Sequence, residues 1–315
     1  MASDEGVFDS RRMNPQRNLL RLPDFIIIGA MKSATSTLFE QLSRQPGIFM
    51  CEPKEPNYFS DDRQFHKGIN WYAELFNKAP EDALLGEAST HYTKLPTHPS
   101  TVERMLDSVP DAKLIYVMRH PIDRLISHYM HEWSMGVIRC DIDVAVERYP
   151  ELIAYSQYAM QLEPFLKGYG AQSILPVFFE RISCRPQQEF ERICRHIGYR
   201  GVPVWNQGMQ PANVSAERLR RFPLYNFIFK PELAARLRRR LVPQGWRNWI
   251  KRKLTMRERP VLNASVRASL EQIFDKDLEQ LGEWLGGDLK CGNFKELTAT
   301  RELSFDCGAF PKVIR

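Results

Sequence analysis

A run of small and hydroxyl-bearing residues near the start of the chain joins an apolar segment, 25–29, to an amphipathic one, 35–44. The first segment is rich in isoleucine and ends in glycine, which indicates a buried strand, and the second has leucines at helical spacing. Backbone N–H groups at such a junction, together with the positive end of the helix dipole, form a cradle for an anion. The residues of this cradle are Lys32, Ser33, Ala34, Thr35, Ser36 and Thr37. We therefore predict a phosphate-binding loop, although its spacing is not that of a Walker A motif, and a tight strand-to-helix turn is the alternative.

A second candidate anion site follows another apolar segment, 113–118. Arg119 leaves the end of this predicted strand, and Ser127 lies roughly two turns into the helix predicted at 121–133. Ligands of open α/β folds bind at the carboxyl ends of the strands, so both side chains can face one crevice. A guanidinium suits this task because its planar fork meets two phosphate oxygens at once. A surface salt bridge for Arg119 and a solvent-facing Ser127 are the alternatives without function.

Together the two stretches resemble the phosphate-binding motifs of the sulfotransferases that use 3′-phosphoadenosine 5′-phosphosulfate (PAPS). Residues 29–38 are similar to the loop for the 5′-phosphosulfate, and residues 114–129 to the motif for the 3′-phosphate. The resemblance spans about 24–200 and is closer to the heparan sulfate N- and O-sulfotransferases and to bacterial members than to the cytosolic aryl enzymes. Ala34 stands where the family usually has a glycine, which tightens the loop.

The resemblance also implies roles for individual residues. In the family a lysine and two hydroxyl residues hold the 5′-phosphosulfate, and here these are Lys32, Thr35 and Ser36. An arginine and a serine hold the 3′-phosphate, and here these are Arg119 and Ser127. Two phosphate sites, without an aspartate placed after a strand to hold magnesium, suit a donor that needs no metal.

A general base is implied by the same resemblance. In the glycan branch a glutamate shortly before two aromatic residues takes the proton of the acceptor, and Glu55, ahead of Tyr58 and Phe59, fits this pattern. Lys54 can shift between this base and the bridging oxygen of the leaving group. His91 is the alternative base, because the cytosolic enzymes use a histidine. An exposed ion pair between Lys54 and Glu55 is the alternative without catalysis.

The acceptor is not specified by the sequence. The family usually has a lysine where Ala88 stands, and that lysine contacts a sulfated polysaccharide, so its absence argues against a heparan-like acceptor. A glycan, a glycolipid, another lipid, a small alcohol and a phenol all remain open. Acceptor pockets in this family are built from variable loops.

The elements that position these residues follow from the apolar pattern. Apolar runs indicate strands at 25–29, 84–88, 113–118 and 173–179, and amphipathic runs indicate helices at 35–44, 121–133, 185–197 and 264–285. Such alternation predicts a parallel sheet of four or five strands with helices on both faces. We therefore predict a flexible arm at 1–21 and one α/β domain at 22–315, P-loop-like as the resemblance implies, with a basic helical insertion at 200–260.

Basic residues are concentrated in this insertion. The chain carries a formal charge of +6, but residues 218–259 contain 14 lysines and arginines against two acids, with helical patches at 219–228 and 233–241. Three interpretations compete: a lid in which Arg218 or Arg220 closes over the 3′-phosphate, a surface for an anionic membrane, and a solvated helical hairpin. No recognisable nucleic-acid-binding motif accompanies the segment, so we expect no nucleic-acid partner.

The composition is that of a soluble globular protein, with 43% hydrophobic and 26% charged residues in 315. No apolar run approaches the length of a membrane span, and the first twenty residues contain no apolar core of a secretory signal. The six cysteines are scattered without a CxxC pair, which is typical of free thiols in a reducing compartment. We therefore expect a cytoplasmic location.

These observations predict an enzyme that moves a sulfuryl group from PAPS to a hydroxyl or amine by direct in-line displacement and releases 3′-phosphoadenosine 5′-phosphate (PAP). No metal is expected, because His120, His128 and His131 lack a clear third ligand. A P-loop small-molecule kinase is one alternative, and it requires magnesium. A non-catalytic nucleotide-binding or membrane-docking module is the other, and it binds PAP without turnover.

Overall fold

A five-stranded parallel sheet forms the centre of the computed structural model, which describes residues 20–208, 218–219, 255–256, 258–308 and 310. The strand order is β2-β3-β1-β4-β5, and each neighbouring pair runs parallel. The strands are β1 (Phe25–Gly29), β2 (Ile48–Met50), β3 (Leu84–Ala88), β4 (Lys113–Met118) and β5 (Ile174–Phe178). The predicted parallel sheet is confirmed, and the short strand β2 completes it.

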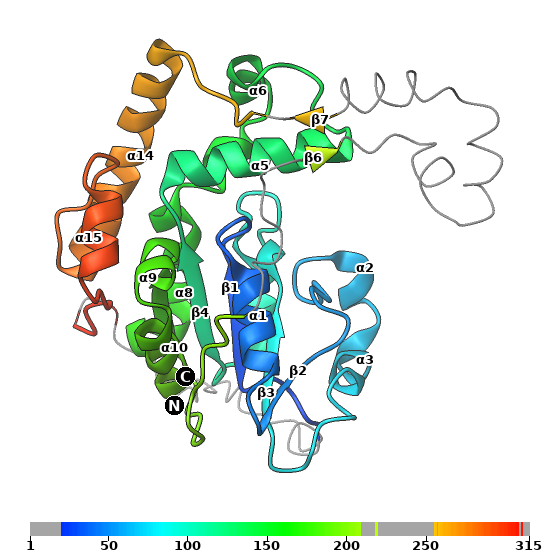
Figure 1. Ribbon diagram of the computed structural model, residues 1–315. Coiled ribbons are helices and arrows are strands. Elements are labelled where there is room, and N and C mark those ends of the chain that lie inside the picture. The colour runs from blue at the N-terminus through cyan, green and yellow to red at the C-terminus, as the bar shows by residue number, and fades with distance from the viewer. Residues whose placement is uncertain (1–19, 209–217, 220–254, 257, 309, 311–315) are drawn as a thin grey trace, which may run out of the picture.

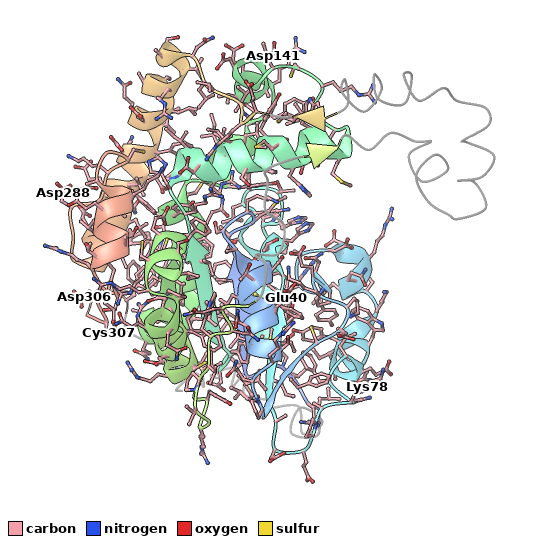
Figure 2. All side chains as sticks on the ribbon, viewed as in Figure 1. Glu40, Lys78, Asp141, Asp288, Asp306 and Cys307 are labelled. Atoms are coloured by element: carbon pink, nitrogen blue, oxygen red, sulfur yellow. The ribbon has the colours of Figure 1, made fainter. Side chains whose placement is uncertain are left out.

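Helices cover both faces of the sheet, because successive side chains of each strand enter opposite apolar layers (Figure 1). Phe25 and Ile27 of β1 lie in one layer, and Ile26 and Ile28 lie in the other. The first layer contains α1 (Thr35–Ser43) and α10 (Pro186–His196). The second contains α3 (Gly68–Glu74), α4 (Thr101–Ser108), α5 (Pro121–Met135), α8 (Tyr158–Tyr169) and α14 (Ala264–Leu285). Side chains fill the space between the sheet and the helices on each of its faces (Figure 2).

Short helices complete the described part of the chain. They are α2 (Asp62–Phe65), η2 (Thr90–Thr93), α6 (Ile142–Arg148), α7 (Glu151–Ala154), η3 (Ala171–Ser173), α9 (Phe179–Cys184) and α15 (Phe294–Thr300). In Figure 1, α2 and α3 lie at the β2 side of the sheet, and α14 and α15 lie at the opposite side. Helix α5 crosses the sheet at the carboxyl end of β4, where the candidate site residues gather (Figure 1).

The long C-terminal helix α14 has the predicted bounds and packs one face on the core. Leu270, Phe274 and Leu278 lie on this face and are buried. Ile273 is 38% exposed, because it lies about 100° around the helix from Phe274, toward the edge of the buried face.

Little of the basic insertion falls within the described residues. Strand β6 (Arg218–Leu219) pairs antiparallel with β7 (Thr255–Met256), so the helix predicted to begin at Leu219 does not begin there. The rest of that helix and the one predicted at 233–241 lie outside the described residues. In the described part of the chain, no helix has both the length and the apolar character to cross a membrane.

The N-terminal arm also lies outside the described residues up to position 19. Arg21, at the end of the predicted arm, donates hydrogen bonds to the carbonyl oxygens of Ala79 and Pro80 at 2.6 and 2.7 Å. The chain is therefore anchored to the domain just before β1.

Candidate active site

The loop between β1 and α1 has the backbone of an anion cradle. Lys32 and Ala34 adopt left-handed conformations with φ values of 74° and 67°, which turn the chain sharply before α1. A Cβ atom at Gly29 would lie 2.0 Å from Oγ1 of Thr93, so only glycine fits at the end of the strand. No side chain caps the N-terminus of α1, and the buried Oγ atom of Ser33 has no hydrogen-bond partner. Such uncapped N–H groups and an unpartnered hydroxyl suit an incoming anion.

The second predicted site lies on the neighbouring strand. The amide of Ala30 donates to the carbonyl oxygen of Val117 at 2.8 Å, so the loop begins beside the end of β4. Arg119 follows β4, and Ser127 is buried on α5. The two predicted phosphate sites therefore arise from adjacent central strands.

The side chain of Arg119 contacts an aromatic ring, and no carboxylate pairs with its Nε atom. Its guanidinium lies over the ring of Phe179 at 4.6 Å, and its buried Nε atom has no hydrogen-bond partner. Tyr158 holds the backbone, because its hydroxyl bonds to both the amide and the carbonyl oxygen of Arg119. Burial lowers the pKa of Arg119, so a bound anion would offset an existing desolvation cost.

Lys54 joins the candidate base to the phosphate loop. Its Nζ atom donates to Oγ of Ser36 at 2.8 Å and lies 3.4 Å from Oε1 of Glu55. Oγ1 of Thr90 donates to the same Glu55 oxygen at 3.3 Å. The carboxylate predicted to accept a proton is thus one lysine away from the residues predicted to hold the 5′-phosphosulfate.

Residues 22–274 match the family described as the sulfotransferase domain. The chain belongs to the sulfotransferase domain family. It is 30% identical over 194 residues to heparan sulfate glucosamine 3-O-sulfotransferase 3A1 of Mus musculus, covering 58% of this chain and 47% of that one. It is 38% identical over 114 residues to the membrane-associated sulfotransferase kil1 of Dictyostelium discoideum, covering 35% and 23%. The chain spans about half the length or less of these curated relatives.

A solved sulfotransferase from Alicyclobacillus acidocaldarius has the same fold. The two structures superpose with a TM-score of 0.60 at 21% identity, over 86% of this chain and 98% of the other. The predicted membership of the PAPS-dependent family, and its α/β architecture, are therefore confirmed.

His91 of this sulfotransferase domain lies in η2, next to Thr90, which contacts Glu55. Its ring stacks on His98 with 5.3 Å between the centroids. Burial, together with the positive charge of Lys94, lowers the pKa of His91 to about 4. The imidazole is neutral at pH 7, but a group with so low a pKa is a weak proton acceptor.

Ala88 ends β3 in a fully buried position of the sulfotransferase domain. A basic residue missed by sequence reasoning lies six positions further along the chain. Lys94 is partly buried, its Nζ lies 5.7 Å from the centre of the Tyr155 ring, and burial lowers its pKa to about 8. The charges of Glu55 and Glu132 oppose that shift, which places Lys94 near both carboxylates. A lysine within a stretch whose apolar pattern predicts burial is the signal in the sequence that could have identified Lys94.

The described ends of the basic insertion are held by two helices, α1 and α5. Gln41 of α1 exchanges two hydrogen bonds with the backbone of Asn206, at 3.0 and 2.9 Å. Strand β6, which contains Arg218, lies beside α5 (Figure 1). Arg259, just after β7, pairs with Asp123 of α5 at 2.6 Å. The insertion therefore leaves from the helix of the phosphate loop and returns at the helix of Ser127.

His120 and His128, two of the histidines considered as metal ligands, have other contacts. Nε2 of His120 lies 3.1 Å from the carbonyl oxygen of Cys291, and Nε2 of His128 lies 3.5 Å from Glu132. Among the described residues, no three or more His, Cys, Asp or Glu side chains gather as metal ligands would. Independence from metal stays a prediction.

Proposed function

We propose that the protein is a sulfotransferase that moves a sulfuryl group from PAPS to a hydroxyl or amine acceptor and releases PAP. The observation that carries this proposal is the pair of contacts from Lys54 to Ser36 and Glu55, which joins a phosphate loop to a carboxylate. Membership of the sulfotransferase domain family supports the reaction type.

The donor fits the residues that are present. The unpartnered Oγ of Ser33 and the uncapped start of α1 suit the 5′-phosphosulfate, together with Lys32. The unpartnered Nε of Arg119 suits the 3′-phosphate, together with Ser127. Thr35, Ser36 and Thr37, on the first turn of α1, offer further hydroxyl donors. Arg218, a residue of the strand β6 beside α5, is proposed as a further residue that binds the donor.

In the proposed reaction the acceptor oxygen or nitrogen forms a bond to sulfur as the bond from sulfur to the phosphate oxygen breaks. Glu55 takes the proton of the acceptor and passes it to solvent, so the products are the sulfated acceptor and PAP. Negative charge develops on the departing phosphate oxygen. Lys32, Lys54 and the N-terminus of α1 stabilise that charge by electrostatics.

Glu55 is preferred to His91 as the base because Glu55 contacts Lys54, which reaches the phosphate loop, whereas the ring of His91 stacks on His98. We therefore assign proton transfer to Glu55 rather than to His91.

We infer a hydroxyl of a glycan, glycolipid or small alcohol as the acceptor. The relatives named for heparan sulfate favour a glycan, and the buried Ala88 argues against the same polysaccharide contact. Contact of residues 218–259 with an anionic membrane is a further proposal. All six cysteines are free thiols, which supports the proposed cytoplasmic location.

The test is a screen of acceptor classes with labelled PAPS, run in EDTA and again with magnesium. We expect turnover of at least one acceptor in EDTA, and a loss of about 100-fold or more in kcat for Glu55→Gln. His91→Gln tests the alternative base: a loss of kcat that falls on this variant, and not on Glu55→Gln, would assign proton transfer to His91. An absolute need for magnesium would favour the kinase alternative, and PAP binding without any turnover would favour the non-catalytic module.

A further inference from the structure

We propose that Glu87 and Ser89 are positioning residues that hold the base Glu55 in place through the loop on which it lies. The inference rests on the role proposed for Glu55 above. It concerns the end of β3, a segment that contributes neither a charge to the phosphate loop nor a proton acceptor to the reaction.

The loop that bears Glu55 needs outside support. Glu55 and Asn57 both adopt left-handed conformations, with φ values of 58° and 53°. Side chains with a Cβ atom disfavour this region, so two such residues within three positions persist only where the surroundings hold them. Pro56 lies between them and has no N–H of its own to contribute.

Three successive residues at the end of β3 supply that support. The amide of Glu55 donates to the carbonyl oxygen of Ala88 at 3.1 Å, and the amide of Asn57 donates to Oγ of Ser89 at 3.0 Å. Oγ1 of Thr90 donates to Oε1 of Glu55 at 3.3 Å. Both left-handed residues, and the carboxylate itself, are thus held from one short segment.

Glu87 sets the direction of the Ser89 hydroxyl. Oγ of Ser89 donates its only proton to Oε1 of Glu87 at 2.5 Å, which leaves its lone pairs for the amide of Asn57. The other oxygen of Glu87 accepts a hydrogen bond from the hydroxyl of Tyr72. The chain of contacts from Tyr72 through Glu87 and Ser89 ends on the loop of the base.

The burial of Glu87 supports a role beyond packing. Its side chain is fully buried, and burial raises its pKa to about 7. The groups that face it are Tyr72, Tyr92, Ser89, Cys51 and Glu55, so no cation among them offsets its charge. An apolar residue of similar size would fill this position at lower cost, so the carboxylate is explained by the hydrogen bonds that it accepts from Ser89 and Tyr72.

The test compares kcat with PAP affinity in the whole 315-residue chain. We expect Ser89→Ala to lower kcat about 10- to 100-fold, because a misplaced catalytic group costs rate even when binding is intact. The Kd of PAP should stay within about twofold, because the phosphate loop is not altered. Ser134→Ala is the matched control: this serine of α5 also donates a hydrogen bond, to the carbonyl oxygen of His131 at 2.7 Å, and its loss should leave kcat unchanged.

Variants of Glu87 show whether it acts through Ser89. Glu87→Gln keeps an oxygen for the Ser89 hydroxyl and should retain kcat within about threefold, whereas Glu87→Leu should lose as much as Ser89→Ala. In the Ser89→Ala background Glu87→Leu should cause no further loss of kcat, because both act on one contact. If Glu87→Leu fails to fold, Glu87→Gln and Ser89→Ala still decide the question.

Two outcomes distinguish the positioning role of Glu87 and Ser89 from the role proposed for Glu55 as the base. If Glu55→Gln loses turnover but Ser89→Ala keeps it, or if kcat and PAP affinity fall together with the melting temperature, the positioning role is wrong and the base stands. If Glu55→Gln itself keeps its turnover, the base is wrong and the positioning role falls with it.

Discussion

The donor side and the base side of this site are built in different ways. The proposed donor side lies at the ends of the adjacent strands β1 and β4, and each of its two parts is one unbroken stretch of chain. The proposed base side lies at the ends of β2 and β3, on the other side of β1, and hydrogen bonds between distant residues assemble it, such as Thr90 with Glu55, 35 positions apart. A site built from contiguous motifs is recognisable in a sequence, and a site built from long-range contacts is not.

The polar groups of the two sides also differ in whether they have hydrogen-bond partners. On the donor side the described groups include a buried hydroxyl and a guanidinium nitrogen without partners, as in Ser33 and Arg119. On the base side Glu55, Ser89 and Glu87 already have partners within the protein, and among the residues of the Glu55 loop the buried Oδ1 atom of Asn57 has none. We infer that the donor supplies the missing contacts on one side, while the other side is preorganised.

The largest expected effect is on the donor side. Lys32→Ala should lower kcat by about 100- to 1000-fold, because a positioned charge at the departing oxygen is removed. Steady-state kinetics with labelled PAPS measure this, with a thermal melt to show that the fold is kept. A loss of kcat below about threefold would mean that the backbone N–H groups of the loop stabilise the departing oxygen without Lys32, and that the charge of this lysine matters little to the rate.

A pH-dependent effect should mark the base side. Folding raises the pKa of Glu87 from an ordinary carboxyl value to about 7, so its contribution to stability is present at low pH and is lost as the pH rises through 7. We expect the free energy of unfolding of Glu87→Gln, relative to the natural protein, to improve by about 3 kcal/mol between pH 4.5 and 8. Urea denaturation at several pH values measures it.

The same series has an internal control. Asp277 also has its pKa raised by burial, to about 6, and it is present in both proteins, so its contribution cancels. Parallel stability curves for the two proteins would show that Glu87 does not titrate in this range.

Lys54 is the contact between the two sides, and its removal should cost less than that of Lys32. Lys54→Met should lower kcat about tenfold, because Ser36 and Glu55 lose a shared partner while each keeps its own segment. Lys67→Met is the matched control, since Lys67 donates to Gln64 on the exposed surface. Equal activity of the two variants would remove Lys54 from the account.

The smallest effect should come from Ala34. Its φ of 67° is one that glycine adopts readily and alanine does not. Ala34→Gly should therefore raise the free energy of unfolding by about 0.5 kcal/mol. This is the backbone strain relieved in the folded loop less the conformational entropy that glycine adds to the unfolded chain. Ala145→Gly, within the helix α6, should instead destabilise by about 1 kcal/mol. A loss of stability for Ala34→Gly would contradict the strained loop.

The features that could be predicted from the sequence lie mainly on the donor side of the site. The strands β1 and β4, the phosphate loop and the Arg119 segment were predictable, because each pattern is complete within about 20 residues. Glu87, Ser89 and Thr90 were not assigned to the site, since their partners lie at Tyr72 and in the Glu55 loop. Strand β2 has three residues, too few for a periodic pattern.

The central claim is that two anion sites hold opposite ends of one nucleotide. Titration calorimetry of PAP and of adenosine 5′-phosphate against the natural protein, Arg119→Ala and Lys32→Ala tests it most directly. We expect Arg119→Ala to weaken PAP about 10- to 100-fold and leave adenosine 5′-phosphate within about twofold, while Lys32→Ala weakens both. If Arg119→Ala weakens both nucleotides equally, or neither of them, Arg119 does not hold the 3′-phosphate and the claim is wrong.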